Sequence, residues 1–178
     1  MGNICDIKYK VIKFRTRHKL ECNLEGTKGL VVVLGLNPST ADNDISNDDA
    51  TVKYLKRKFN KIYKKMIIYN LFENYSTDSH FIARDTKTDF ENPTVKKDLE
   101  DAVEIVVGWG TDKNFIAEKI AAINVLKRYA DKIRCLSTDK KRPYHPSRLP
   151  NDAMVIPIEI ADLENCLKIG AKVEKYYE

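Results

Sequence analysis

The chain has 178 residues, of which 43% are hydrophobic and 32% charged, a balance that excludes fibrous and disordered proteins and predicts a single domain over residues 1–178. No apolar run approaches the roughly 20 residues that a membrane span needs, and the first residues lack the pattern of a signal peptide, so we expect a cytoplasmic protein with no membrane partner. The formal net charge of +5 favours an anionic partner.

The first part of the chain predicts strands separated by a helix. Residues 5–15 alternate loosely between apolar and basic side chains, which is consistent with a strand or hairpin. Residues 30–34 form an apolar, β-branched run between two glycines and predict a central strand that is buried on both faces. Residues 48–65 carry apolar side chains at steps of three and four, which predicts an amphipathic helix. Residues 66–69 predict the next strand.

The same alternation continues after a long polar loop. We expect a short helix that begins near residue 93, a strand over 104–107, a helix over 113–129, a strand over 133–136, an edge strand within 153–160 and a helix over 162–168. Pro157 restricts the last strand to an edge, because proline cannot donate a ladder hydrogen bond. The alternation predicts an α/β fold in three layers, with a mainly parallel sheet of about four strands and helices on both faces.

Polar or aromatic residues follow each predicted strand. They are Asn37, Asn70, Trp109 and His145. In a parallel sheet the carboxyl ends of the strands lie at one edge, where α/β proteins bind ligands, so we expect these residues to converge on one pocket. Trp109 is also explained as a packing residue, because tryptophan usually supplies buried area.

Four short motifs lie at these positions, and a fifth opens the helix predicted over 48–65. They are Gly-Leu-Asn-Pro-Ser-Thr-Ala-Asp at 35–42, Asp-Asp-Ala-Thr at 48–51, Asn-Leu-Phe at 70–72, Trp-Gly at 109–110 and His-Pro-Ser-Arg-Leu at 145–149. Together they resemble DUF1643, a family of uncharacterised bacterial and phage proteins, over most of the chain. In order and spacing they are also similar to the uracil-DNA glycosylase superfamily. That second resemblance implies a glycosylase-like fold and hydrolysis of the N-glycosidic bond of a modified or mismatched base in DNA, or in a related nucleotide.

The glycosylase resemblance implies a role for each motif. Asn37 would hold the attacking water, and His145 would donate to the departing base as a neutral imidazole. Asn70 would read the base edge through its paired donor and acceptor. Leu149 or Arg148 would fill the space left by a flipped nucleotide, unless Arg148 binds phosphate. The implied substrate-binding residues are Gly35, Leu36, Pro38, Ser39, Asn70, Phe72, Ser147, Arg148 and Leu149.

Two positions depart from the glycosylase pattern. Asn37 stands where the most active uracil glycosylases have aspartate, and an amide cannot act as a general base. Ser39 stands where those enzymes have a bulky tyrosine that excludes the thymine methyl, which favours a 5-substituted pyrimidine or another altered base over plain uracil. The loop at 145–149 also lacks a second proline that is common in that superfamily.

Two other functions remain open at this point. The first is a non-catalytic module that binds a nucleobase or nucleotide in the same pocket. The second is a metal-dependent phosphohydrolase that uses the acidic residues Asp42, Asp44, Asp48 and Asp49, although these lack the spacing of a calcium loop and Asp48 or Asp49 is equally suited to cap the following helix. We expect no metal and no cofactor, a monomer, and DNA or a nucleotide as the partner.

Overall fold

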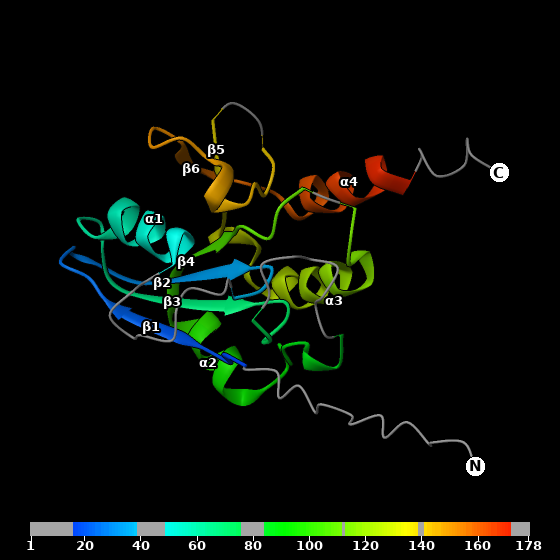
Figure 1. The fold of residues 1–178 in the computed structure, drawn as a ribbon, viewed down its shortest axis with the longest axis horizontal. Coiled ribbons are helices and arrows are strands. Elements are labelled where there is room, and N and C mark those ends of the chain that lie inside the picture. The colour runs from blue at the N-terminus through cyan, green and yellow to red at the C-terminus, as the bar shows by residue number, and fades with distance from the viewer. Residues whose placement is uncertain (1–15, 39–48, 76–83, 112, 139–140, 172–178) are drawn as a thin grey trace, which may run out of the picture.

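The computed structural model describes residues 16–38, 49–75, 84–111, 113–138 and 141–171. They form a mixed α/β fold in which one sheet has the strand order β1-β3-β2-β4-β5-β6 (Figure 1). The strands are β1 (Leu20–Asn23), β2 (Lys28–Gly35), β3 (Tyr63–Asn70), β4 (Ala102–Val107), β5 (Ile133–Ser137) and β6 (Met154–Pro157). The helices are α1 (Ala50–Phe59), α2 (Pro93–Asp101), α3 (Ile116–Leu126) and α4 (Ile160–Ala171), with short 3₁₀ turns η2 (Arg84–Thr86), η3 (Lys127–Lys132) and η4 (Pro146–Arg148).

The sheet of the described residues has six strands and is partly antiparallel, whereas the sequence predicts a mainly parallel sheet of about four strands with an added edge strand. Strands β3, β2, β4 and β5 pair in parallel, whereas β1 runs antiparallel to β3 and β6 antiparallel to β5. The edge strand expected within 153–160 is β6, with Pro157 at its end. Strand β1 was missed because its sequence, Leu-Glu-Cys-Asn, is short and half polar. The hairpin expected over 5–15 lies outside the described residues.

Alternate side chains of β2 point to opposite faces of the sheet, and both faces are covered. Val31 and Val33 pack in one apolar cluster with Leu55 of α1. Val32 and Leu34 belong to a second cluster, which also contains Val95 and Leu99 of α2, Ala122, Ile123 and Leu126 of α3, and Leu163 of α4. Helix α1 therefore covers one face, while the other three helices contribute to the core on the opposite face.

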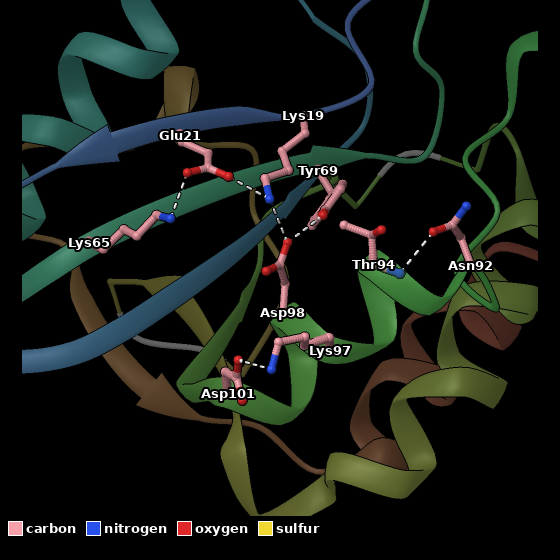
Figure 2. A network of polar contacts seen from close by, with 9 residues as sticks. All are labelled: Lys19, Glu21, Lys65, Tyr69, Asn92, Thr94, Lys97, Asp98 and Asp101. Carbon is pink, nitrogen blue, oxygen red and sulfur yellow. Dashed lines mark hydrogen bonds and ion pairs between the residues drawn. The ribbon is translucent and has the colours of Figure 1, made fainter.

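A network of polar contacts ties the edge strand β1 to α2 (Figure 2). Lys19 Nζ donates to Asp98 at 2.9 Å and lies 2.5 Å from Glu21, which also pairs with Lys65 at 2.6 Å. The Tyr69 hydroxyl donates to the same Asp98 carboxylate at 2.6 Å. Hydrogen bonds from Lys19 and Lys65 lower the pKa of Glu21 to about 2. These contacts hold β1 against β3 although its sequence signal is weak.

Helix α1 is shorter than the apolar periodicity predicts. It ends at Phe59, the backbone N–H of Ile62 turns back to the Phe59 carbonyl at 2.9 Å, and β3 begins at Tyr63. Tyr63 is buried in the cluster beneath α1 as the first residue of β3. Burial of this ring in the sheet stabilises the early end of the helix. Among the described residues, no helix combines the length and the apolar character that crossing a membrane requires.

Candidate functional site

A cavity of about 580 Å³ opens at the carboxyl ends of β2 and β3. Its floor includes Val33 and Ile68, which belong to the core cluster on the α1 side of the sheet. The N-terminus of α1 forms one wall, and the segment 144–148 that leads into η4 forms another. The cavity therefore lies where loops and a helix end meet at the edge of a parallel sheet, a common ligand position in α/β proteins.

Several residues that the sequence motifs singled out line this cavity. They are Gly35, Leu36, Asn37, Asn70, His145, Ser147 and Arg148. They come from the end of β2, the end of β3 and the loop after β5, and the parallel pairing of the intervening strands brings these ends to one edge. The two proposed catalytic residues and the proposed base-reading amide thus share one cavity.

Other singled-out residues lie elsewhere. Phe72 is fully buried in the core on the α2 and α3 side, where its ring meets that of Phe115 edge to face with centroids 4.7 Å apart. Trp109 is buried in the same core. Leu149 is half-buried against the cluster beneath α1. Pro38 is buried but does not line the cavity, and Ser39 lies outside the described residues.

Asn70 is the last residue of β3 and is only 4% exposed. Its Nδ2 is buried and has no hydrogen-bond partner among the described residues. The β2–β3 register places Asn70 opposite Gly35, which has no side chain to displace the amide. A buried donor left unpaired costs about 1–3 kcal/mol, so an acceptor brought by a ligand would be stabilised there.

His145 is held by the turn that follows it. The backbone N–H of Ser147 donates to Nδ1 at 3.3 Å, and Ser147 Oγ lies 2.8 Å from the same nitrogen. A ring nitrogen that accepts a hydrogen bond carries no proton, so the neutral imidazole has its proton on Nε2. The Ser147 backbone N–H therefore favours the tautomer that donates through Nε2, whereas the Ser147 hydroxyl can pair with Nδ1 in either tautomer.

The loop that carries His145 is anchored on α1. The Tyr54 hydroxyl donates to the carbonyl of Pro150 at 3.0 Å, and Arg57 donates to the Asn151 side chain at 2.9 Å. Burial raises the pKa of Tyr54, which keeps its hydroxyl protonated and able to donate. Helix α1 thus holds η4 beside the cavity.

Asn37 follows β2 and lines the same cavity. Its Nδ2 donates to the carbonyl of Pro38 at 3.1 Å. This contact orients the amide within the turn. An amide side chain donates and accepts hydrogen bonds but does not titrate. Asn37 is suited to position a water molecule but cannot remove a proton from it.

Sequence reasoning missed Arg17, which precedes β1 and lines the cavity. Its backbone N–H donates to the Glu73 carbonyl at 2.7 Å, which places it beside the end of β3. Its Nη1 lies 3.9 Å from Asp49 Oδ2, and its guanidinium lies 5.6 Å from the centre of the Tyr75 ring. Arg17 has basic neighbours and no motif, so only the fold reveals its position.

Asp49 is the N-cap of α1, and its Oδ1 accepts the backbone N–H of Val52 at 2.8 Å. The capping role considered for this residue is therefore what its contacts show. Within the described part of the chain, no group of three or more His, Cys, Asp or Glu side chains is arranged to hold a metal ion. Asp42, Asp44 and Asp48 lie outside the described residues.

The family model of DUF1643, whose description is "Protein of unknown function", matches residues 17–147. This segment includes the cavity residues Arg17, Asn37, Asn70 and His145. No curated protein and no solved structure gives a significant match. The family match spans well over half of the chain, and the chain therefore belongs to the DUF1643 family.

Proposed function

We propose that the cavity binds the base of a nucleotide unit and that the protein hydrolyses its N-glycosidic bond. One observation carries this proposal: Asn70, whose buried amide donor has no partner among the described residues, lines the same cavity as His145, whose contact with the Ser147 backbone N–H favours the Nε2–H tautomer. The volume of about 580 Å³ falls within the range of about 300–1,000 Å³ that is usual for small-molecule sites. The substrate we propose is a modified or mismatched pyrimidine in DNA or in a related nucleotide.

Each residue has a defined part in the proposed reaction. As the bond between the sugar carbon and the base nitrogen breaks, the electron pair leaves with the base, and the His145 Nε2–H stabilises the negative charge that develops there. A water molecule held by Asn37 adds to the sugar carbon and loses its proton to solvent, while the departing base takes up a proton. Asn70 holds the base edge. Since Asn37 is no general base, we expect slow turnover that depends on orientation.

The proposal includes a finer fold class, a three-layer α/β/α arrangement of the uracil-DNA glycosylase type. Helix α1 on one face and α2 and α3 on the other, around four parallel strands, support it. DNA would reach the cavity from the side of η4, where Arg148 is exposed and lines the opening. A wedge role for Leu149 has less support, because this side chain packs against the core beneath α1.

The test is the release of bases from single-stranded and duplex oligonucleotides that carry altered pyrimidines, measured as alkali-labile abasic sites. We expect release by the native protein and a loss of about 10²–10³-fold in rate for His145→Ala, because one positioned donor is removed. Asn124→Ala, which changes an exposed amide on α3, is the matched control for Asn37→Ala and Asn70→Ala. Failure to release a base from any of these substrates would count against the proposed hydrolysis.

A second candidate is a non-catalytic sensor of a base or nucleotide, and the amide at position 37 favours it because it lacks a titratable group. This candidate predicts saturable ligand binding that Asn70→Ala abolishes, without any abasic sites. The metal-dependent phosphohydrolase has no supporting contact among the described residues, where Asp49 caps the start of α1 by accepting the Val52 backbone N–H.

A further inference from the structure

We infer that Arg17 is the anion-binding residue of this cavity and that the ligand carries a phosphate group beside its base. The inference deepens the proposed function, because it assumes that the ligand is a nucleotide unit. It concerns a residue that no sequence motif marks and that lies at the opposite end of the family segment from His145.

The side chain of Arg17 is largely buried yet weakly satisfied. Its Nε is buried and has no hydrogen-bond partner among the described residues. The nearest carboxylate oxygen, on Asp49, is 3.9 Å from Nη1, which is too long for a hydrogen bond. The Tyr75 ring, 5.6 Å from the guanidinium carbon, accepts no conventional N–H bond but is placed for a cation–π contact. The guanidinium therefore keeps donors for an oxygen-rich group.

The Asp49 carboxylate does not occupy the hydrogen-bond donors of Arg17. Its Oδ1 is held by the Val52 backbone N–H at 2.8 Å, so the carboxylate is fixed at the start of α1. There it attracts the guanidinium without hydrogen-bonding to it. Among the described residues that line the cavity, the charged Arg and Asp side chains are two positive ones, Arg17 and Arg148, and one negative one, Asp49.

A second unpartnered donor comes from the adjacent strand. Asn70 is 96% buried, from an exposed fraction of 4%, and its Nδ2 lacks a partner among the described residues. Ala50 and Thr51, in the first turn of α1, line the same cavity, and a helix N-terminus favours an anion. Both unpartnered nitrogens belong to residues that line the cavity and both are donors, so the complementary ligand presents acceptors. A phosphate next to a pyrimidine carbonyl provides them.

The phosphate has two sources, the monoester of a free nucleotide and the diester of a DNA strand. Isothermal titration calorimetry with thymidine, thymidine 5′-monophosphate and the trinucleotide TpTpT, which has only internal phosphates, separates them. We expect both phosphorylated ligands, or the monophosphate alone, to bind about tenfold or more tightly than thymidine. Preference for the monophosphate over TpTpT indicates a free nucleotide, whereas equal or tighter binding of TpTpT indicates DNA.

Variants show whether Arg17 causes that preference. Arg17→Ala should remove the difference between thymidine and its phosphorylated forms, and Arg17→Lys, which retains a charge without the planar fork, should restore part of it. Arg128→Ala, which removes an exposed arginine paired with Glu91, is the control for a general effect of net charge. Thermal unfolding of each variant verifies that it is folded.

Three results would overturn the inference: equal binding of thymidine and its phosphorylated forms, equal weakening of all ligands by Arg17→Ala in a folded protein, or no binding of any of them. The proposed hydrolysis is judged separately. A protein that releases no base but retains an Arg17-dependent preference for phosphate leaves this inference intact.

Discussion

The side-chain oxygen of Asn70 occupies the space that a β-carbon on residue 35 would need. A β-carbon built on Gly35 would lie 2.5 Å from Asn70 Oδ1, closer than real β-carbons approach other atoms. The two residues are partners in the parallel register of β2 and β3. Gly35 is therefore a positioning residue, because the amide can occupy this place only while residue 35 has no side chain.

Gly35→Ala should displace the Asn70 amide and weaken ligand binding. The obstructing atom is the end of a side chain, so the amide should move while the strands remain paired, with a loss of about 1–3 kcal/mol in the free energy of unfolding. Calorimetry with thymidine 5′-monophosphate measures binding, and denaturant unfolding measures stability.

A double-mutant cycle tests whether Gly35 acts through Asn70. If it does, Gly35→Ala should have little further effect on binding in a protein that already carries Asn70→Ala, because the displaced group is absent. Fully additive losses in binding would show that Gly35 acts by another route.

The sequence predicted which strand ends lie together, but it did not predict which of the residues at those ends face the cavity. Asn37, Asn70 and His145 share a cavity because the ends of parallel strands lie at one edge, which follows from the order of strands and helices alone. Phe72 and Trp109 also follow strands, yet both are buried in the core on the α2 and α3 side. The position of a residue after a strand determines at which edge of the sheet it lies. The side of the sheet on which its side chain lies depends on the local turn of the backbone.

Long-range pairing explains what the sequence could not predict. Strand β1 has four residues with a polar, mixed pattern, and its place depends on contacts with β3 and on the network around Glu21. Arg17 lies beside the cavity where its backbone N–H pairs with Glu73, a residue far from it in the chain. Neither of these long-range contacts is associated with a local sequence pattern from which it could be predicted.

The tautomer of His145 should persist without the Ser147 hydroxyl. Ser147→Ala retains the backbone N–H that donates to Nδ1, so nitrogen chemical shifts of the ring should still report Nε2–H in the neutral form. If the proposed hydrolysis operates, base release by Ser147→Ala should fall by no more than about tenfold, since only one supporting contact is lost. A switch to the Nδ1–H tautomer would contradict the assigned role of the backbone.

Glu21→Gln should change how stability depends on pH. The two lysine contacts lower the pKa of Glu21 to about 2, so the ionised carboxylate stabilises the fold above its unfolded pKa, and this contribution is lost as the pH falls through the folded value. The window is therefore about pH 5 down to about pH 2. Because Glu21 is 44% exposed in its side chain, solvent screening limits the effect to no more than about 1 kcal/mol.

The measurement is denaturant unfolding of the native protein and Glu21→Gln at several pH values across that window. The native protein should be the more stable at pH 6, and the difference should shrink towards pH 2. Lys97→Met, which removes the exposed pair with Asp101 and leaves Glu21 untouched, is the comparison variant (Figure 2). A difference that is constant with pH would contradict the role of the charge.

Trp109→Phe should separate packing from chemistry at the Trp-Gly pair. Trp109 is 1% exposed within the core on the α2 and α3 side, whereas its neighbour Gly110, with φ of 90°, lines the cavity on the other. The smaller ring should leave space in the core and lower the free energy of unfolding by about 1–3 kcal/mol. Binding of thymidine 5′-monophosphate should change by less than about threefold, because no atom of the cavity wall is removed.

Circular dichroism must follow unfolding, since Trp109 is the single tryptophan of the chain and its fluorescence is lost. A tenfold loss of binding with unchanged stability would instead give the indole a direct role in the cavity.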